Sequence, residues 1–109
     1  MNVAPVVLFV YNRPWHTCQT IEALQKNDLS GQTDLIVFSD AAKDQEALAK
    51  VQEVRKYIKN INGFKSVQVV EREENWGLAK SIIHGVTEVV NQYGKVIVLE
   101  DDIVTSPAF

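Results

Sequence analysis

The chain has 109 residues, of which 46% are hydrophobic and 23% are charged, a balance that fits one globular domain with a buried core. Its formal net charge of -3 argues against a general nucleic-acid binder, which would carry a basic stripe. No apolar stretch approaches the ~20 residues of a membrane-spanning helix, and the start, MNVAPVVLFVYNRP, lacks the features of a signal peptide. We therefore expect a cytoplasmic setting, at most peripheral to a membrane in the full-length protein, with no transmembrane segment in this chain and no nucleic-acid partner.

Four short apolar runs predict β-strands that are covered on both faces. They are PVVLFVY at residues 5–11, DLIVFS at 34–39, SVQVV at 66–70 and KVIVLE at 95–100. β-Branched and aromatic residues dominate these runs, as is typical of strands.

Three amphipathic patterns between the runs predict helices at residues 14–26, 44–60 and 77–93. Pro14 suits the first helical turn, where its missing N–H has no partner. The expected buried stripes are Trp15, Cys18, Ile21 and Leu24; then Ala47, Val51, Val54 and Ile58; then Leu78, Ile82, Val86 or Val89, and Tyr93. The lone cysteine, Cys18, is expected to be a small buried hydrophobic residue.

The alternation of strands and helices predicts an α/β fold: a three-layer α/β/α arrangement with a mainly parallel sheet and right-handed crossovers. In such a sheet, ligands bind outside the carboxyl ends of the strands. Four polar stretches follow the strands: YNRPW at 11–15, DAAKD at 40–44, EREENWG at 71–77 and EDDIVTS at 100–106. We expect the strand order 3-2-1-4, which places Asp40 and Asp102 on either side of the first strand's end.

The acidic triplet of Glu100, Asp101 and Asp102 has two explanations. Consecutive side chains in a strand point to opposite faces, so at most two of these carboxylates can converge on one ligand. A hard cation such as Mg²⁺ or Mn²⁺ would offset their repulsion. The alternative is a solvated turn in which one acid caps the next helix.

The order of motifs resembles the N-terminal half of a nucleotide-sugar glycosyltransferase with the GT-A fold, in the family 2-like group. The resemblance rests on YNRP, a second strand ending in SD, ENWGLAKSIIHGV and YGKVIVLEDDIVTSPAF, and it covers essentially the whole chain. The tail also resembles the acidic segment of N-acetylglucosaminyltransferase I. This resemblance implies a Rossmann-like partial GT-A domain at residues 1–109.

In that family the acidic segment is the DXD motif, which implies that Asp102 binds the metal, Asp101 lies near the ribose and Glu100 lies nearer the donor sugar. The resemblance also implies that Asp40 reads the uracil ring, although a turn or cap role explains Asp40 equally well. Arg13 could clamp a diphosphate or be exposed beside Pro14.

Tyr11 and Asn12 could border the base, or Tyr11 could end the core strand. NWGLAK corresponds to the family's NxGxxxA pattern, in which Gly77 lets the backbone approach the nucleotide. Asn75 is then expected to cap the helix and Lys80 to lie near phosphate. Trp76 could cover the base or pack on the sheet. The Arg and Asn that many members carry are replaced here by Ile82 and Ile83.

The expected function is therefore that of a metal-dependent glycosyltransferase with a nucleoside-diphosphate sugar donor, UDP-linked, a saccharide or other hydroxyl acceptor, and Mn²⁺ or Mg²⁺ as cofactor. The alternative is a non-catalytic α/β module, either receiver-like for signalling or a degenerate transferase that binds a partner. TSPAF carries a helix-start signature, so we expect a truncated domain without transfer activity, able to dimerise through the fourth strand at residues 96–99.

Overall fold

The computed structural model describes residues 4–100, in which strands and helices alternate. The strands are β1 (Val6–Val10), β2 (Asp34–Ser39), β3 (Ser66–Glu71) and β4 (Ile97–Glu100). The helices are α1 (Pro14–Gln25), α2 (Gln45–Ile58) and α3 (Leu78–Tyr93), with a short 3₁₀ turn, η1, at Ser30–Gln32. The predicted elements are confirmed to within two residues at each end, except that η1 was not predicted.

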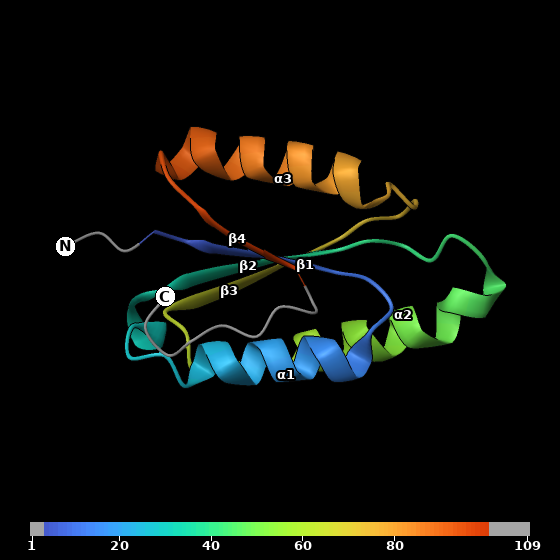
Figure 1. The fold of residues 1–109 in the computed structure, drawn as a ribbon, viewed down its shortest axis with the longest axis horizontal. Coiled ribbons are helices and arrows are strands. Elements are labelled where there is room, and N and C mark those ends of the chain that lie inside the picture. The colour runs from blue at the N-terminus through green and yellow to red at the C-terminus, as the bar shows by residue number, and fades with distance from the viewer. Residues whose placement is uncertain (1–3, 101–109) are drawn as a thin grey trace.

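The four strands form one parallel sheet in the order β3-β2-β1-β4, as predicted. Val6 of β1 pairs with Leu35 of β2 on one side and with Ile97 of β4 on the other. Figure 1 shows α1 and α2 against one face of the sheet and α3 against the other. The three-layer architecture is thereby confirmed, and β1 and β2 lie at its centre.

The core has two halves because alternate residues of each strand point to opposite faces. Val6, Leu8 and Val10 face α1 and α2 and pack with Ile21 and Val54. Val7, Phe9, Ile36 and Phe38 face α3 and pack with Val89. All residues of β1 are buried, whereas β3 and β4 are partly exposed, so only the two central strands are covered fully on both faces.

The buried stripe of α2 is as predicted, whereas that of α1 is not. Ala47, Val51, Val54 and Ile58 are all buried, and the Asp44 carboxylate caps α2 by accepting a bond from the Ala47 N–H at 2.9 Å. In α1, by contrast, Trp15 is 66% exposed and Cys18 is only half-buried. Each three-residue step falls about 60° short of a helical turn, so Trp15 lies opposite Leu24 on the helix.

Helix α1 therefore buries a different set of side chains from the one expected. Thr17 and Thr20 join Ile21 and Leu24 on the buried face. Cys18 is not a buried hydrophobic residue: its Sγ donates a hydrogen bond to Glu22 Oε1 at 3.4 Å.

Helix α3 buries its expected stripe only in part: Val89 is buried, and Ile82 and Val86 are half-buried against the core. Ser81, Gly85 and Val89 point at the sheet, while Leu78 and Tyr93 are 52% and 38% exposed. The small residues are selected because a Cβ on Gly85 would lie 2.9 Å from Phe9 Cζ, closer than side chains approach one another. The two phenyl rings, stacked with centroids 5.3 Å apart, therefore determine which side of α3 faces the sheet.

The carboxyl ends of β2 and β3 are tied together from α2 by Arg55. Its guanidinium donates to Ser39 Oγ and Ser39 O, and also to the carbonyl of Arg72, which follows β3, at 2.9 Å. Three bonds from one half-buried side chain therefore fix the spacing of the two strand ends on which the polar loops are built.

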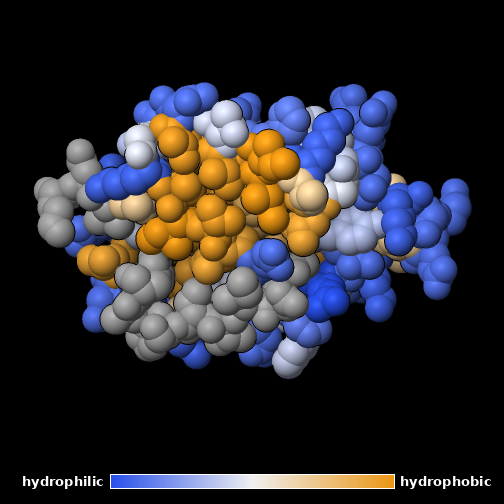
Figure 2. Space-filling view, turned by 45° about the horizontal axis from the view of Figure 1, so that its top comes forward, coloured by the Kyte–Doolittle hydropathy of each residue, from blue (hydrophilic) through white to orange (hydrophobic). Residues whose placement is uncertain are grey.

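An apolar surface remains on the α3 side of the molecule. Ile83 and Val90 of α3 and Val98 of β4 are 64%, 38% and 38% exposed, and Figure 2 shows a broad apolar area on this face. Strand β4 lies at one edge of the sheet formed by the described residues. Dimerisation through this edge stays a prediction. No helix in residues 4–100 is long and apolar enough to cross a membrane.

Candidate functional site

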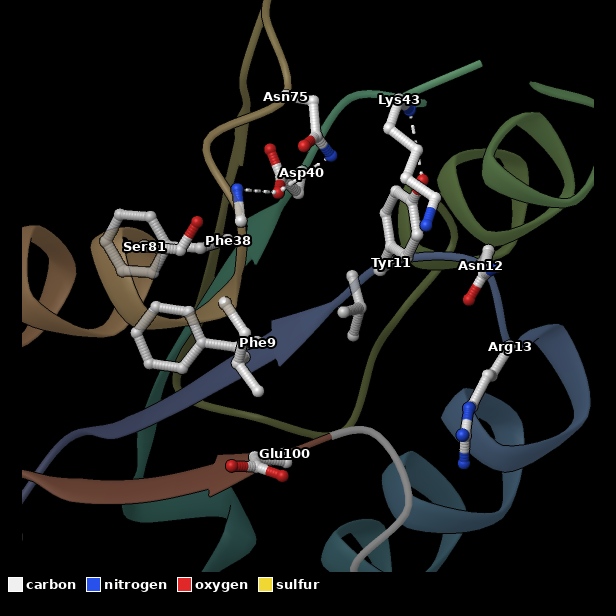
Figure 3. Close-up of a pocket in the computed structure, with 13 residues that line it drawn as sticks. Phe9, Tyr11, Asn12, Arg13, Phe38, Asp40, Lys43, Asn75, Ser81 and Glu100 are labelled. Atoms are coloured by element: carbon white, nitrogen blue, oxygen red, sulfur yellow. Dashed lines mark hydrogen bonds between the residues drawn. The ribbon is translucent and has the colours of Figure 1, made fainter. Parts of the chain in front are cut away.

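A cavity of about 340 Å³ opens at the carboxyl ends of β1 and β2. The N-terminus of α3 and the end of β4 complete its walls. The strand order reverses between β1 and β4, and ligands in open α/β sheets bind at such a switch point. Figure 3 shows Asp40 and Glu100 on opposite sides of this space, with Phe9 between them.

Seven of the predicted site residues line this cavity: Tyr11, Asn12, Arg13, Asp40, Asn75, Gly77 and Glu100. They come from four separate stretches of the chain, which the parallel sheet brings to one edge. Lys80 is not among the lining residues. Asp101 and Asp102 lie outside the described residues.

Asp40 organises one side of the cavity, and its side chain is buried, with 8% of the residue exposed. Its Oδ1 accepts the N–H groups of Ala41 at 2.9 Å and Trp76 at 2.8 Å. Its Oδ2 accepts the N–H of Gly77 at 2.9 Å and the Asn75 amide at 3.3 Å. A carboxylate has about four acceptor positions, so this one is fully used in holding the turn at residues 75–77.

The turn at residues 75–77 starts α3 in a way that the sequence did not predict. Gly77, not Asn75, is the N-cap residue, and its φ of +79° belongs to a region that favours glycine. The Asn75 amide instead donates to the carbonyl of Ala41 at 2.7 Å. The predicted cap at Asn75 is therefore wrong: Asp40, from another strand end, accepts the N–H groups of Trp76 and Gly77 at the start of the helix.

Two aromatic residues near the site have structural contacts. The Tyr11 hydroxyl accepts the N–H of Lys43 at 3.0 Å, which links the end of β1 to the loop after β2. The Trp76 ring has the Arg72 guanidinium 3.9 Å and the Lys80 ammonium 4.7 Å from its centroid. Trp76 does not line the cavity, so the structure favours packing over contact with a ligand, and Lys80 lies against this ring.

Six further lining residues were not among the predicted site residues: Phe9, Val10, Phe38, Lys43, Leu78 and Ser81. Phe9 and Phe38 lie inside strands, where the sequence marks them only as core. Ser81 is not a member of the apolar stripe that was expected for this helix. Lys43 lies in the DAAKD stretch after the second strand, and this position could have predicted it as a site residue.

The residues that would hold a divalent cation are only partly described. Within residues 4–100, no group of three or more His, Cys, Asp or Glu side chains could hold a metal ion. Glu100 pairs with Phe9 across β4 and β1, and it brings one carboxylate to the cavity. Carboxylate oxygen is the ligand that Mg²⁺ and Mn²⁺ prefer, so the donor chemistry at this end fits such a cation.

The fold defines an α/β domain of the Rossmann-like GT-A type, with a cavity at the carboxyl ends of its strands. Among solved structures, S. aureus TarS matches with a TM-score of 0.64 and 19% sequence identity, over 97% of this chain and 18% of that one. The chain thus spans less than a fifth of the length of TarS, and this similarity supports the fold only.

The family follows from the sequence match. The chain belongs to glycosyl transferase family 2, whose model matches residues 6–109. No curated protein is similar enough to this chain to count as a match. Because the chain belongs to a glycosyltransferase family, the alternative of a receiver-like signalling module is set aside.

Proposed function

We propose that this chain forms the donor-binding part of a metal-dependent glycosyltransferase. The donor is a nucleoside-diphosphate sugar, UDP-linked, and the acceptor is a saccharide or another hydroxyl compound. The observation that carries the proposal is the cavity at the β1, β2 and β4 ends, lined by residues from all four polar stretches, in a chain of family 2.

The base is proposed to lie on the Asp40 side of the cavity, bordered by Tyr11 and Asn12. Of the four donors on the Asp40 carboxylate, the Asn75 amide is the farthest, at 3.3 Å, and that amide also has the Ala41 carbonyl as an acceptor. The imide N–H of uracil can therefore replace the Asn75 amide on Asp40 without leaving a buried donor unpaired.

The diphosphate and the sugar are proposed to lie toward Arg13 and Glu100. A guanidinium binds diphosphate oxygens in bidentate fashion, and Gly77 has no side chain to obstruct the approach of the nucleotide. Asp101 would lie near the ribose, and Asp102, with Glu100 close by, would hold Mg²⁺ or Mn²⁺. The chemistry that such a cation supplies is neutralisation of the charge that builds on the departing diphosphate.

A thermal-shift titration of the purified chain with UDP, GDP and CDP, each with and without Mn²⁺, tests this proposal. We expect UDP with Mn²⁺ to raise the melting temperature most, since a ligand that binds only the folded state stabilises it. Asp102→Asn should abolish the Mn²⁺-dependent part of the shift, and Glu100→Gln should reduce it much less. No shift with any nucleotide would refute the proposal, and equal Mn²⁺ responses in wild type and Asp102→Asn would refute the metal site.

A further inference from the structure

Ser81 is buried in the wall of the cavity with an unused hydroxyl group. Only 5% of the residue is exposed, and in the described part of the chain its Oγ has no hydrogen-bond partner. Leaving a buried hydroxyl unpaired costs stability, so such groups call for an explanation. Because Ser81 lines the cavity, a ligand there can supply the missing partner.

The Ser81 hydroxyl does not make the bond that is commonest for a hydroxyl in a helix. A helical Ser or Thr commonly donates to the carbonyl four residues earlier, and Thr87 in the same helix does so, to Ile83 O at 2.6 Å. For Ser81 the corresponding carbonyl is that of Gly77, which already accepts the Ser81 N–H at 3.0 Å. The Ser81 side chain does not add a bond to it, although Thr87 shows that α3 permits one.

Ser81 lies where the packing of α3 on the sheet gives way to the cavity. One turn later, Gly85 sits against Phe9 and Phe38 with no room for a side chain. Near Ser81 the Phe9 and Phe38 rings line the cavity, and Figure 3 shows Ser81 beside them. The hydroxyl is thus a polar group beside two aromatic walls of the cavity.

These surroundings favour a flat heterocycle over a phosphate. The two cations that line the cavity, Arg13 and Lys43, lie on the other side of it from Ser81 in Figure 3. Phosphate oxygens are stabilised by such cations, whereas aromatic rings suit the faces and edges of a base. A neutral hydroxyl beside phenyl rings matches a base carbonyl.

We infer that Ser81 is a base-recognition residue whose hydroxyl donates a hydrogen bond to a carbonyl oxygen of the pyrimidine. The inference rests on the proposed binding of a uridine nucleotide and adds a specific contact to it. It also assigns the N-terminal part of α3 a direct role in selecting the donor.

The test compares wild type with Ser81→Ala in two titrations, one with UDP and one with inorganic pyrophosphate, both in the presence of Mn²⁺. We expect the Kd for UDP to rise about threefold to tenfold in Ser81→Ala, the range for one lost neutral hydrogen bond. The Kd for pyrophosphate, which has no base, should not change. Without ligand, Ser81→Ala should melt at the same temperature as wild type or higher, because it removes an unpaired buried hydroxyl.

Ser66→Ala is the matched control, since Ser66 Oγ donates to Asp34 Oδ1 at 2.6 Å at the other end of the sheet. It should leave UDP binding unchanged. An unchanged Kd for UDP in Ser81→Ala would overturn the inference, and so would an equal loss with pyrophosphate, which would place the hydroxyl at the diphosphate. If wild type binds pyrophosphate but not UDP, or neither, the proposed function itself fails, and the inference fails with it.

Discussion

Replacing Asp40 by Asn should destabilise the protein strongly, even though the two side chains have nearly the same shape. The carboxylate accepts four hydrogen bonds, three of them from backbone N–H groups. An amide keeps one oxygen and turns the other position into a donor. In its better orientation the amide oxygen serves Ala41 and Trp76, and the N–H of Gly77 is left facing an NH₂ group.

The size of this effect follows from the number of bonds affected. One buried backbone N–H without an acceptor costs about 1–3 kcal/mol, and the remaining bonds lose the assistance of a charge. We therefore expect a loss of roughly 2–4 kcal/mol in the free energy of unfolding, out of a total of about 5–15 kcal/mol for a domain. At about 4–8 °C per kcal/mol, the melting temperature should fall by about 10 °C or more.

Urea unfolding followed by circular dichroism measures this loss, and hydrogen exchange should show faster exchange at the N–H groups of Trp76 and Gly77. Asp44→Asn is the matched control because Asn is as good an N-cap residue as Asp, so little change is expected there. If Asp40→Asn unfolds within about 0.5 kcal/mol of wild type, a span typical of surface substitutions, the carboxylate does not hold the turn and the reasoning is refuted.

Three other substitutions test the packing and the polar ties of the fold. Gly85→Ala should cost about 1–3 kcal/mol in urea unfolding, because the new Cβ would lie 2.9 Å from Phe9 Cζ; an unchanged midpoint would contradict the close packing of α3. Arg55→Met should cost about 1–3 kcal/mol by breaking the tie between the ends of β2 and β3, whereas Lys56→Met, at the next and exposed position, should cost far less. Burial raises the pKa of the Tyr57 phenol above its usual range, so the folded state keeps this proton after the unfolded state has lost it. Stability should therefore be full below about pH 10 and fall as the pH rises further, and Tyr57→Phe should show a smaller fall in unfolding free energy over that range, with equal falls contradicting the assignment.

Sequence periodicity predicted most of the fold because most elements bury large apolar side chains. The stripe of α2 was found for this reason. The buried face of α3 was predicted only in part. Val89 was found, whereas Ser81 and Gly85 carry no hydrophobic signal, and their small size matters only against Phe9 and Phe38, which are far away in the sequence.

The candidate site was predicted at the level of its loops but not of its hydrogen bonds. Parallel strands place all their carboxyl ends at one edge, so the polar stretches after the strands had to meet there. Which donors reach Asp40 depends on how the turn at residues 75–77 lies against the residues that follow β2, and no spacing in the sequence encodes that path. The contacts of the Trp76 ring with Arg72 and Lys80 likewise could not be predicted from a pattern of single residues.

The central place of β1 in the sheet has a consequence for how the site comes into being. Its pairing of Val6 with Ile97 joins residues close to the two ends of the described chain. Contacts so distant in sequence form slowly, because a long loop must close before they stabilise anything. The space between Phe9 and Glu100 is therefore expected to be a late product of folding, after β1, β2 and β3 have paired. Until β4 pairs with β1, the backbone N–H and C=O groups along one side of β1 have no partners. The strand order that forms the site therefore also creates a folding intermediate that can pair with the wrong strand.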